Sequence, residues 1–206
     1  MRSVREHFDT YAESYEEVLN FPIISNFIRT RDKEVETFLK GANGTLLDVG
    51  VGTGYYLVKF SRKFRKIVVL DISKKMLEVF RSRIGKRENI EMKLGSVKDF
   101  ESRKKFDAIL CVGVFNYAKQ NETSKIIRKF YRLLKTNGSV LITFPDKNNV
   151  FGKIYSAFWN ARGVKIKTFT KREVLDILRK EGFKDIEIKD KSNNMPTFHL
   201  IAKAKK

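Results

Sequence analysis

The stretch that most constrains the fold is residues 46–55, LLDVGVGTGY, where an apolar run gives way to alternating glycines. This pattern predicts a buried strand, a tight turn and the start of a helix. Because Gly50, Gly52 and Gly54 carry no Cβ, the backbone there can take positive φ angles and approach a ligand closely. A helix that begins at the turn points free N–H groups and its positive end at the same ligand.

A second apolar run, residues 67–70, ends in Asp71, seventeen residues after Gly54. A carboxylate at the end of the second strand of such a unit can accept hydrogen bonds from both hydroxyls of a ribose. The two stretches together predict the nucleoside-binding half of a doubly wound α/β sheet.

The rest of the chain alternates in the same way. Helices are expected over 53–64, 74–84 with Ser73 as N-cap, and 122–134; strands are expected over 45–49, 66–71, 90–94, 106–112 and 139–144. Residues 2–40 are predicted to be helical with a break at Pro22. A last helix begins at Thr170, has Glu173 in a capping box and ends at Gly182.

Two strands at 186–188 and 198–202 are expected to form an antiparallel hairpin, followed by a frayed lysine-rich end at 203–206. The predicted fold class is α/β: a three-layer, doubly wound, mostly parallel seven-stranded sheet with a C-terminal antiparallel hairpin and N-terminal helices.

The length of 206 residues fits one domain, 1–206, with residues 1–40 as an N-terminal helical cap and 146–168 as an insertion over the substrate. No apolar run is long enough to cross a bilayer, and the first residues lack the apolar segment of a secretory signal. Cys111 is the single cysteine, so no internal disulfide forms. These features favour a cytoplasmic protein.

The charge balance is unusual, because 43 Lys and Arg stand against 24 Asp and Glu, for a net charge of +19. Such an excess favours a polyanionic partner such as RNA, whose phosphates release counterions on binding. Thermophile surfaces offer another explanation, but they raise Glu together with Lys. Cations outside the insertion that could extend a basic face include Arg29, Arg31, Lys63, Arg65 and Lys66.

With these elements in order, the chain resembles class I S-adenosylmethionine-dependent methyltransferases of the compact single-domain type. The resemblance rests on residues 8–15, 48–54, 70–73, 106–110 and 133–138 and on the terminal hairpin. It implies S-adenosylmethionine as cofactor and S-adenosylhomocysteine as product. The implied cofactor-binding set is Tyr11, Tyr15, Asp48, Gly50, Gly52, Gly54, Asp71, Ile72, Met76, Ser96, Val97 and Cys111.

Within this set, the resemblance implies that the glycines pack under the methionine part, Asp48 holds its amino group, Asp71 binds the ribose and Ile72 lies against the adenine. Ser96 stands where the family usually has an acid. Tyr11 and Tyr15, like Phe8, either anchor the first helix on the domain or reach the methionine carboxylate. Met76 and Cys111 also fit simple packing roles.

Methyl transfer from a sulfonium needs an aligned, desolvated nucleophile and no obligatory acid and base pair. His7 and His199 are therefore expected to be structural, and no metal site is expected. The acceptor should lie past the fourth strand, which makes Asn116 and Tyr117 the candidates for catalysis and substrate binding.

The insertion adds aromatic residues at helical spacing among cations. Its candidate substrate-binding residues are Phe151, Lys153, Tyr155, Trp159 and Arg162. Aromatics among cations are typical of a single-stranded RNA platform, but the same spacing fits an amphipathic lid that only packs over the site.

The leading hypothesis is N-methylation of a base in structured RNA, with ribosomal RNA or a ribosomal subunit as partner. The alternative is a small-molecule or lipid methyltransferase of the quinone or phospholipid-headgroup type, whose basic surface meets an anionic membrane or substrate. A non-catalytic cofactor-binding protein is disfavoured because the glycine and ribose motifs are intact.

Overall fold

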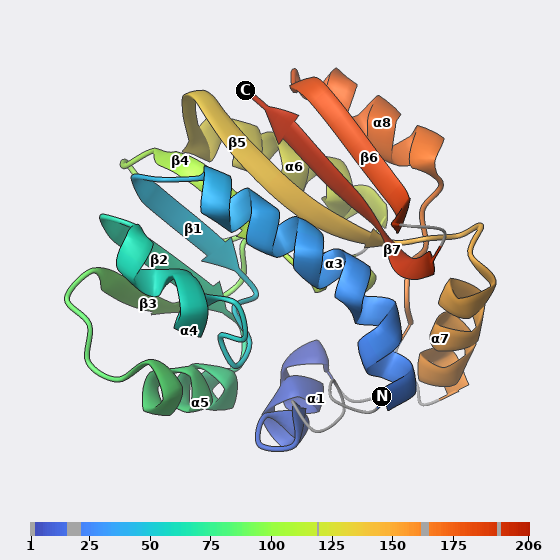
Figure 1. The fold of residues 1–206 in the computed structure, drawn as a ribbon, viewed down its shortest axis with the longest axis horizontal. Helices are drawn as coiled ribbons and strands as arrows, with labels where there is room; N and C mark the ends of the chain where they lie inside the picture. The colour runs from blue at the N-terminus through green and yellow to red at the C-terminus, as the bar shows by residue number, and fades with distance from the viewer. Residues whose placement is uncertain (1–2, 16–21, 119, 162–164, 193–194) are drawn as a thin grey trace.

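The seven strands of the computed structural model form one sheet in the order β3-β2-β1-β4-β5-β7-β6 (Figure 1). The structure describes residues 3–15, 22–118, 120–161, 165–192 and 195–206. The strands are β1 (Thr45–Val49), β2 (Lys66–Asp71), β3 (Ile90–Leu94), β4 (Phe106–Cys111), β5 (Leu134–Pro145), β6 (Lys184–Ser192) and β7 (Met195–Lys205). Strands β1 to β5 pair in parallel, and β7 runs antiparallel to both β5 and β6. The predicted fold class is confirmed.

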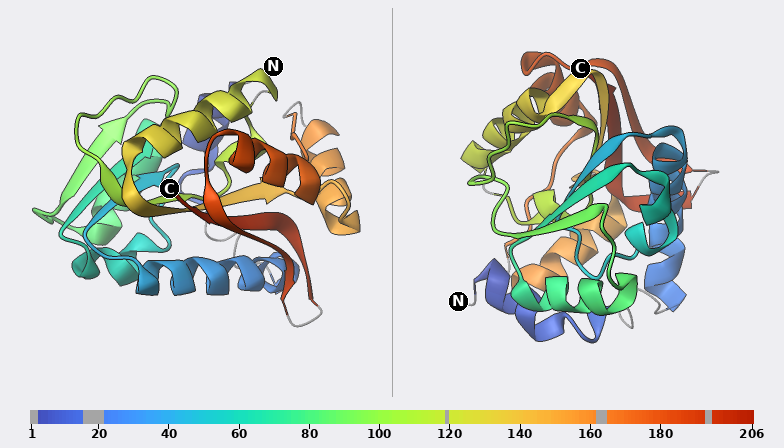
Figure 2. Two further views of the ribbon diagram at one scale, coloured as in Figure 1. Left: turned by 90° about the horizontal axis from the view of Figure 1, so that it is seen from above. Right: turned by 90° about the vertical axis from the view of Figure 1, so that its left-hand side faces the viewer.

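Helices cover both faces of this sheet, as the view from above shows (Figure 2). The longer elements are α1 (Val4–Tyr11), α3 (Pro22–Gly41), α5 (Lys74–Ile84), α6 (Gln120–Leu133), α7 (Val150–Ala161) and α8 (Lys171–Lys180). The short α4 (Leu57–Phe60) continues into the 3-10 turn η1 (Ser61–Lys63), and a second 3-10 turn, η2 (Val114–Asn116), follows β4. No helix of the described residues is long and apolar enough to cross a membrane.

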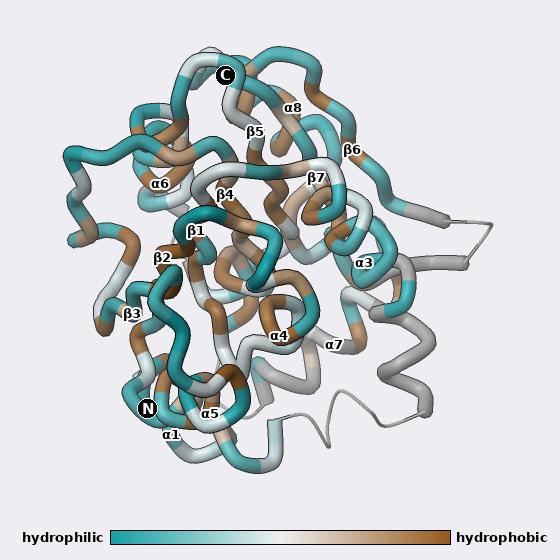
Figure 3. Tube along the Cα trace, turned by 60° about the vertical axis from the view of Figure 1, so that its left-hand side comes forward, coloured by the Kyte–Doolittle hydropathy of each residue, from teal (hydrophilic) through white to brown (hydrophobic). Residues whose placement is uncertain are grey.

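Alternating side chains of the strands divide the core into two clusters. Leu46, Ile67 and Val69 pack with α3, α4 and α5, while Leu47, Val68 and Ile109 pack with α6 and α8 on the other face. This period of two is what a sheet buried on both faces requires. Apolar residues accordingly gather along the strands in Figure 3, and the hydrophilic residues on the outer loops and helix faces.

The predicted helix caps are confirmed. Ser73 accepts a hydrogen bond from the Met76 N–H at 3.0 Å, and Thr170 and Glu173 form the expected capping box. Gly182 follows α8 with a φ of 95°, a conformation that favours glycine. Short-range capping chemistry is local, so the sequence alone specifies it.

Several element boundaries differ from the predictions, and two of them have a clear backbone cause. The helix after the glycine turn begins at Leu57 rather than at residue 53, because the φ angles of Gly52 and Gly54, 55° and 78°, are not helical. Strand β5 begins at Leu134 and not at residue 139, and it includes Asn137, whose φ is 62°. Its pairing with β4 shifts register at the same place.

The lysine-rich end is ordered, so the prediction of a frayed tail is wrong. Residue 205 pairs with Ser139, and the Lys206 ammonium donates to the carbonyl oxygen of Leu134 at 3.0 Å. Lys203 and Lys189 both bind the carboxylate of Glu34, a residue of α3 that is 7% exposed. The tail is held because its charges face a buried carboxylate on another element.

Candidate functional site

The glycine turn joins β1 to α4 at the carboxyl edge of the parallel strands. A Cβ on Gly50 would lie 2.4 Å from a methyl of Val114, and one on Gly54 would lie 2.2 Å from the ring of Phe80. A Cβ on Gly52 would meet no atom within 4 Å. Gly50 and Gly54 therefore allow close packing of the scaffold, whereas Gly52 faces open space at the position where a ligand would approach.

Asp71, at the end of β2, is bound to this turn. Its two carboxylate oxygens accept hydrogen bonds from the backbone N–H groups of Gly52 and Ser73, each at 2.9 Å. Burial raises the pKa of Asp71, although the backbone N–H groups of Ser73, Gly52 and Ile72 oppose that shift. A carboxylate held in this way keeps acceptor capacity on its oxygens, which is what the hydroxyls of a ribose require.

Asp48, the last but one residue of β1, is only 5% exposed. Burial, with the nearby charge of Asp71, raises the pKa of Asp48 to about 8. The carboxyl is therefore mostly protonated at neutral pH until a cation comes near, since a positive charge favours its ionised form. A ligand ammonium at this place would supply that charge.

Helix α1 is fixed to the same edge. The Ser73 hydroxyl donates to Asp9 of α1 at 2.6 Å, and the ring of Phe8 meets that of Tyr117 edge to face at 5.2 Å between centroids. Tyr11 is 36% exposed. Burial raises the pKa of Tyr15, with Arg31 lowering it and Asp71 raising it, so the Tyr15 phenol lies within the field of both charges.

Arg31 of α3 is the main residue of this site that the sequence reasoning missed. Its sequence context suggests a surface cation, but it is 8% exposed and pairs with Asp32 at 3.2 Å. Burial opposes its charge, yet Tyr56, Asp32 and Tyr15 outweigh burial and raise the pKa of Arg31. The available signal was its spacing, four residues before the buried Val35 and thus on the apolar face of α3.

The remaining predicted cofactor residues fall into two groups. Ile72 and Ser96 are partly exposed, and the Ser96 hydroxyl accepts from the Lys98 N–H at 3.2 Å. Met76, Val97 and Cys111 are buried, and burial together with Asp48 raises the pKa of the Cys111 thiol well above its usual value. Cys111 is thus un-ionised, as its packing role predicts.

Comparison with known proteins bears directly on this arrangement. Residues 46–138 match the family model described as a methyltransferase domain. Solved structures with the same fold include a magnesium protoporphyrin IX methyltransferase of Synechocystis PCC 6803, with a TM-score of 0.76 and 15% identity, covering 98% of each chain. Another is the N-methyltransferase NodS of Bradyrhizobium japonicum, with a TM-score of 0.71 and 18% identity, covering 96% of this chain and 98% of NodS.

Residues 46–138 therefore match a methyltransferase domain, and the chain has the fold of these methyltransferases.

Three relatives extend the comparison along the chain. An uncharacterized protein of Methanocaldococcus jannaschii is 28% identical over 87% of this chain and 82% of its own length. An uncharacterized methyltransferase of Bacillus subtilis is 28% identical over 79% of this chain and 83% of its length. Malonyl-[acyl-carrier protein] O-methyltransferase 1 of Ilyobacter polytropus is 26% identical over 71% of this chain, which spans about half (53%) of that enzyme.

Past the carboxyl end of β4, where the acceptor was expected, the chain continues through Gly113 and η2. Asn116 is 4% exposed, and its backbone carbonyl oxygen accepts from the backbone N–H of Lys167 at 3.1 Å. The Lys167 ammonium lies 3.3 Å from the Thr123 hydroxyl and 4.1 Å from the centre of the Phe169 ring. Burial lowers the pKa of Lys167. The structure thus joins the predicted Asn116 to a half-buried cation from the far end of the insertion.

The insertion contains helix α7, which lies beside β7 in Figure 1, so its helical prediction is confirmed. Lys153 is exposed on this helix. The side chains of Phe151, Tyr155 and Trp159, and all of Arg162, lie outside the described residues. Whether these aromatics bind bases or pack as a lid stays a prediction.

The two histidines of the chain are both buried. His7 is 7% and His199 6% exposed. Burial, with Arg31, lowers the pKa of His199 to about 3, so its imidazole is neutral at physiological pH. Among the described residues, no three His, Cys, Asp or Glu side chains gather to hold a metal ion.

Proposed function

We propose that this methyltransferase acts on a small-molecule acceptor bound between η2 and the α1 cap. Binding of the methyl donor is supported above all by the Asp71 carboxylate, which the N–H groups of Gly52 and Ser73 hold in place. S-adenosylmethionine, when bound, supplies an activated methyl group on a sulfonium. Every other task falls to residues of this chain.

The cofactor fits the residues present. Asp71 would accept from the ribose hydroxyls, and Gly52 leaves open space beside it. Asp48 would ionise against the methionine ammonium. Arg31 is a buried cation, and its charge acts on the Tyr15 phenol beside the cofactor site. It is therefore our candidate to bind the methionine carboxylate. Ile72, next to Asp71, is proposed to contact the adenine.

Two kinds of methyl acceptor are possible, a small molecule and a base in RNA. The relatives and neighbours above that are named for a substrate act on malonyl-[acyl-carrier protein] and on magnesium protoporphyrin IX, and none of them is named for RNA. The α1 cap also contacts the acceptor side directly, through Phe8 and Tyr117. A covered site suits a small acceptor better than a base within structured RNA. We therefore prefer the small-molecule alternative to the RNA hypothesis.

The charge of Lys167 limits which chemical groups can serve as the methyl acceptor. The Lys167 ammonium lies 3.3 Å from the Thr123 hydroxyl, and the backbone N–H of Lys167 donates to the backbone carbonyl of Asn116. A positive charge in a partly desolvated position repels a protonated amine and stabilises an oxyanion. We propose a carboxylate or an ionised hydroxyl as the methylated group, with Asn116 and Tyr117 orienting it.

The test is methyl transfer from radiolabelled S-adenosylmethionine into two separate pools, a small-molecule extract and unmodified total RNA. Transfer into the extract, abolished by Asp71→Asn and retained by the exposed control Asp99→Asn, supports the proposal. Label found in RNA alone would contradict it. Base-labile label in the product would further identify a methyl ester.

A further inference from the structure

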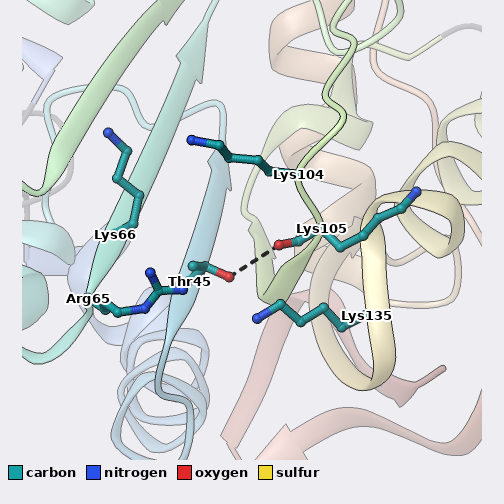
Figure 4. Close-up of a pocket in the computed structure, with 6 residues that line it drawn as sticks. All are labelled: Thr45, Arg65, Lys66, Lys104, Lys105 and Lys135. Carbon is teal, nitrogen blue, oxygen red and sulfur yellow. Dashed lines mark hydrogen bonds between the residues drawn. The ribbon is translucent and has the colours of Figure 1, made fainter.

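A hollow of about 520 Å³ lies at the amino edge of the sheet, opposite the glycine turn (Figure 4). It is lined by the amino ends of four parallel strands and the residues just before them: Thr45, Arg65, Lys66, Lys104, Lys105 and Lys135. Five of these six residues are cationic. We name this feature the basic hollow. It is a place where one part of the +19 net charge is concentrated.

Some of these charges are already engaged. Lys135 pairs with Asp107 at 2.8 Å, Lys66 pairs with Glu91 at 3.3 Å, and the Lys105 ammonium donates to the Arg132 carbonyl at 2.6 Å. In Figure 4 the Lys105 side chain accordingly points away from the other cations.

Arg65 and Lys104 differ from these three. Both are exposed, and within the described part of the chain neither forms an ion pair with a carboxylate. With Lys135 neutralised by Asp107 and Lys66 by Glu91, the basic hollow keeps a surplus of positive charge. Burial lowers the pKa of Lys206 nearby, and the charge of Lys105 lowers it further. Such repulsion costs stability unless an anion relieves it.

We propose that the basic hollow binds a phosphate chain, two or more linked phosphates of one ligand. A guanidinium fork beside several ammonium groups suits phosphate oxygens, which accept bidentate and point-charge contacts at once. Its volume falls in the usual range for small-ligand sites. The site lies at the edge opposite Asp71, so it is separate from the methyl donor and does not depend on the proposed acceptor.

The experiment is calorimetric titration at about 50 mM salt with sodium tripolyphosphate, ATP and a ten-nucleotide single-stranded RNA. The test variant is Arg65→Gln/Lys104→Gln. The matched control is Lys171→Gln/Arg172→Gln, which removes the same charge from exposed positions of α8. We expect the test variant to weaken binding about tenfold or more and the control to change it less than about twofold.

The three probes distinguish the source of the phosphates. Tighter binding of tripolyphosphate and ATP indicates a free polyphosphate or nucleotide. Tighter binding of RNA, with a salt slope that falls by about two in the test variant, indicates a nucleic-acid backbone. Absence of binding to all three overturns the proposal. So does equal weakening in both variants, because binding would then follow the net charge and not the basic hollow. Thermal unfolding of the variants verifies that each is folded.

Discussion

Charged side chains are buried at one edge of the sheet and exposed to solvent at the other. At the carboxyl edge, Asp48, Asp71 and Arg31 are each less than 9% exposed; Asp71 accepts from the Gly52 N–H and Arg31 pairs with Asp32. At the amino edge, Lys104 and Arg65 are exposed, and the Lys135 and Asp107 side chains are 41% and 32% exposed. Charges interact strongly at the first edge and weakly at the second, because water screens the second.

This difference separates chemistry from recognition. Buried groups with shifted pKa values can position a cofactor and a nucleophile, which requires fixed geometry. Exposed cations cannot hold such geometry, but they attract anions over a longer range. Variants at the two edges should therefore differ in the size of their effects and in their dependence on salt.

Asp71→Asn should lower the affinity for S-adenosylmethionine about 100-fold or more, because it removes the charge that two ribose hydroxyls would bind. Calorimetric titration measures the effect. The exposed control Asp99→Asn should bind as the native protein does. Near-native affinity in Asp71→Asn would place the ribose elsewhere.

Gly52 and Gly54 both have a positive φ, but only at Gly54 would an added Cβ overlap a neighbouring side chain. Gly54→Ala should lower the free energy of unfolding by about 2–3 kcal/mol, because its Cβ overlaps Phe80 and adds to the backbone strain. Gly52→Ala carries the strain alone and should cost about 1 kcal/mol. Urea denaturation of the cofactor-free proteins measures both.

The complementary readout is cofactor affinity, which Gly52→Ala should weaken more than Gly54→Ala does. Equal losses of stability in the two variants would contradict the packing role assigned to Gly54.

Asp48→Asn should stabilise the cofactor-free protein at alkaline pH. Folding raises the pKa of Asp48 from 3.8 to about 8, so the folded state binds a proton more tightly than the unfolded state. The stability linked to Asp48 is therefore full below pH 4 and falls as the pH rises towards 8, by about 1.4 kcal/mol for each pH unit.

Thermal midpoints between pH 5 and pH 8 measure this linkage. The advantage of Asp48→Asn over the native protein should grow with pH, provided that no cofactor is present. A constant difference would show that Asp48 stays ionised in the folded state.

Lys135→Gln should cost less than about 1 kcal/mol, since its pair with Asp107 is exposed to solvent and screened. Added salt should reduce the difference further, while the effects of Asp71→Asn should depend little on salt. Thermal unfolding in low and high salt measures it. If Lys135→Gln lowered the free energy of unfolding by several kcal/mol at every salt concentration, the charges at the amino edge would not be screened as proposed.

The site was predictable where its chemistry is local. The strand, glycine turn and following carboxylate at 46–71 lie close together in the sequence, and short connections leave few ways to arrange them. The turn chemistry of Ser73 and Thr170 is similarly local. The helix predicted from residue 53 begins at Leu57, because the glycines that fit the turn exclude helical φ angles before it.

Arg31 and Lys167 could not be placed in the same way. Each joins the site through residues that are distant in the sequence. The charge of Arg31 acts on Tyr15 and His199. Lys167 is hydrogen-bonded to Asn116 and Thr123. Read as sequence, both look like ordinary surface cations. The ordered lysine-rich end was missed for the same reason, since its partner Glu34 lies 169 residues away from Lys203.

The sheet, its glycine turn and the position of Asp71 follow from the sequence alone, because apolar periodicity and glycine spacing are properties of neighbouring residues. Only the tertiary structure decided which cations of a strongly basic chain are buried at the carboxyl edge and which line the basic hollow. Net charge is a sum over the chain, whereas burial and pairing depend on which elements come together in the fold.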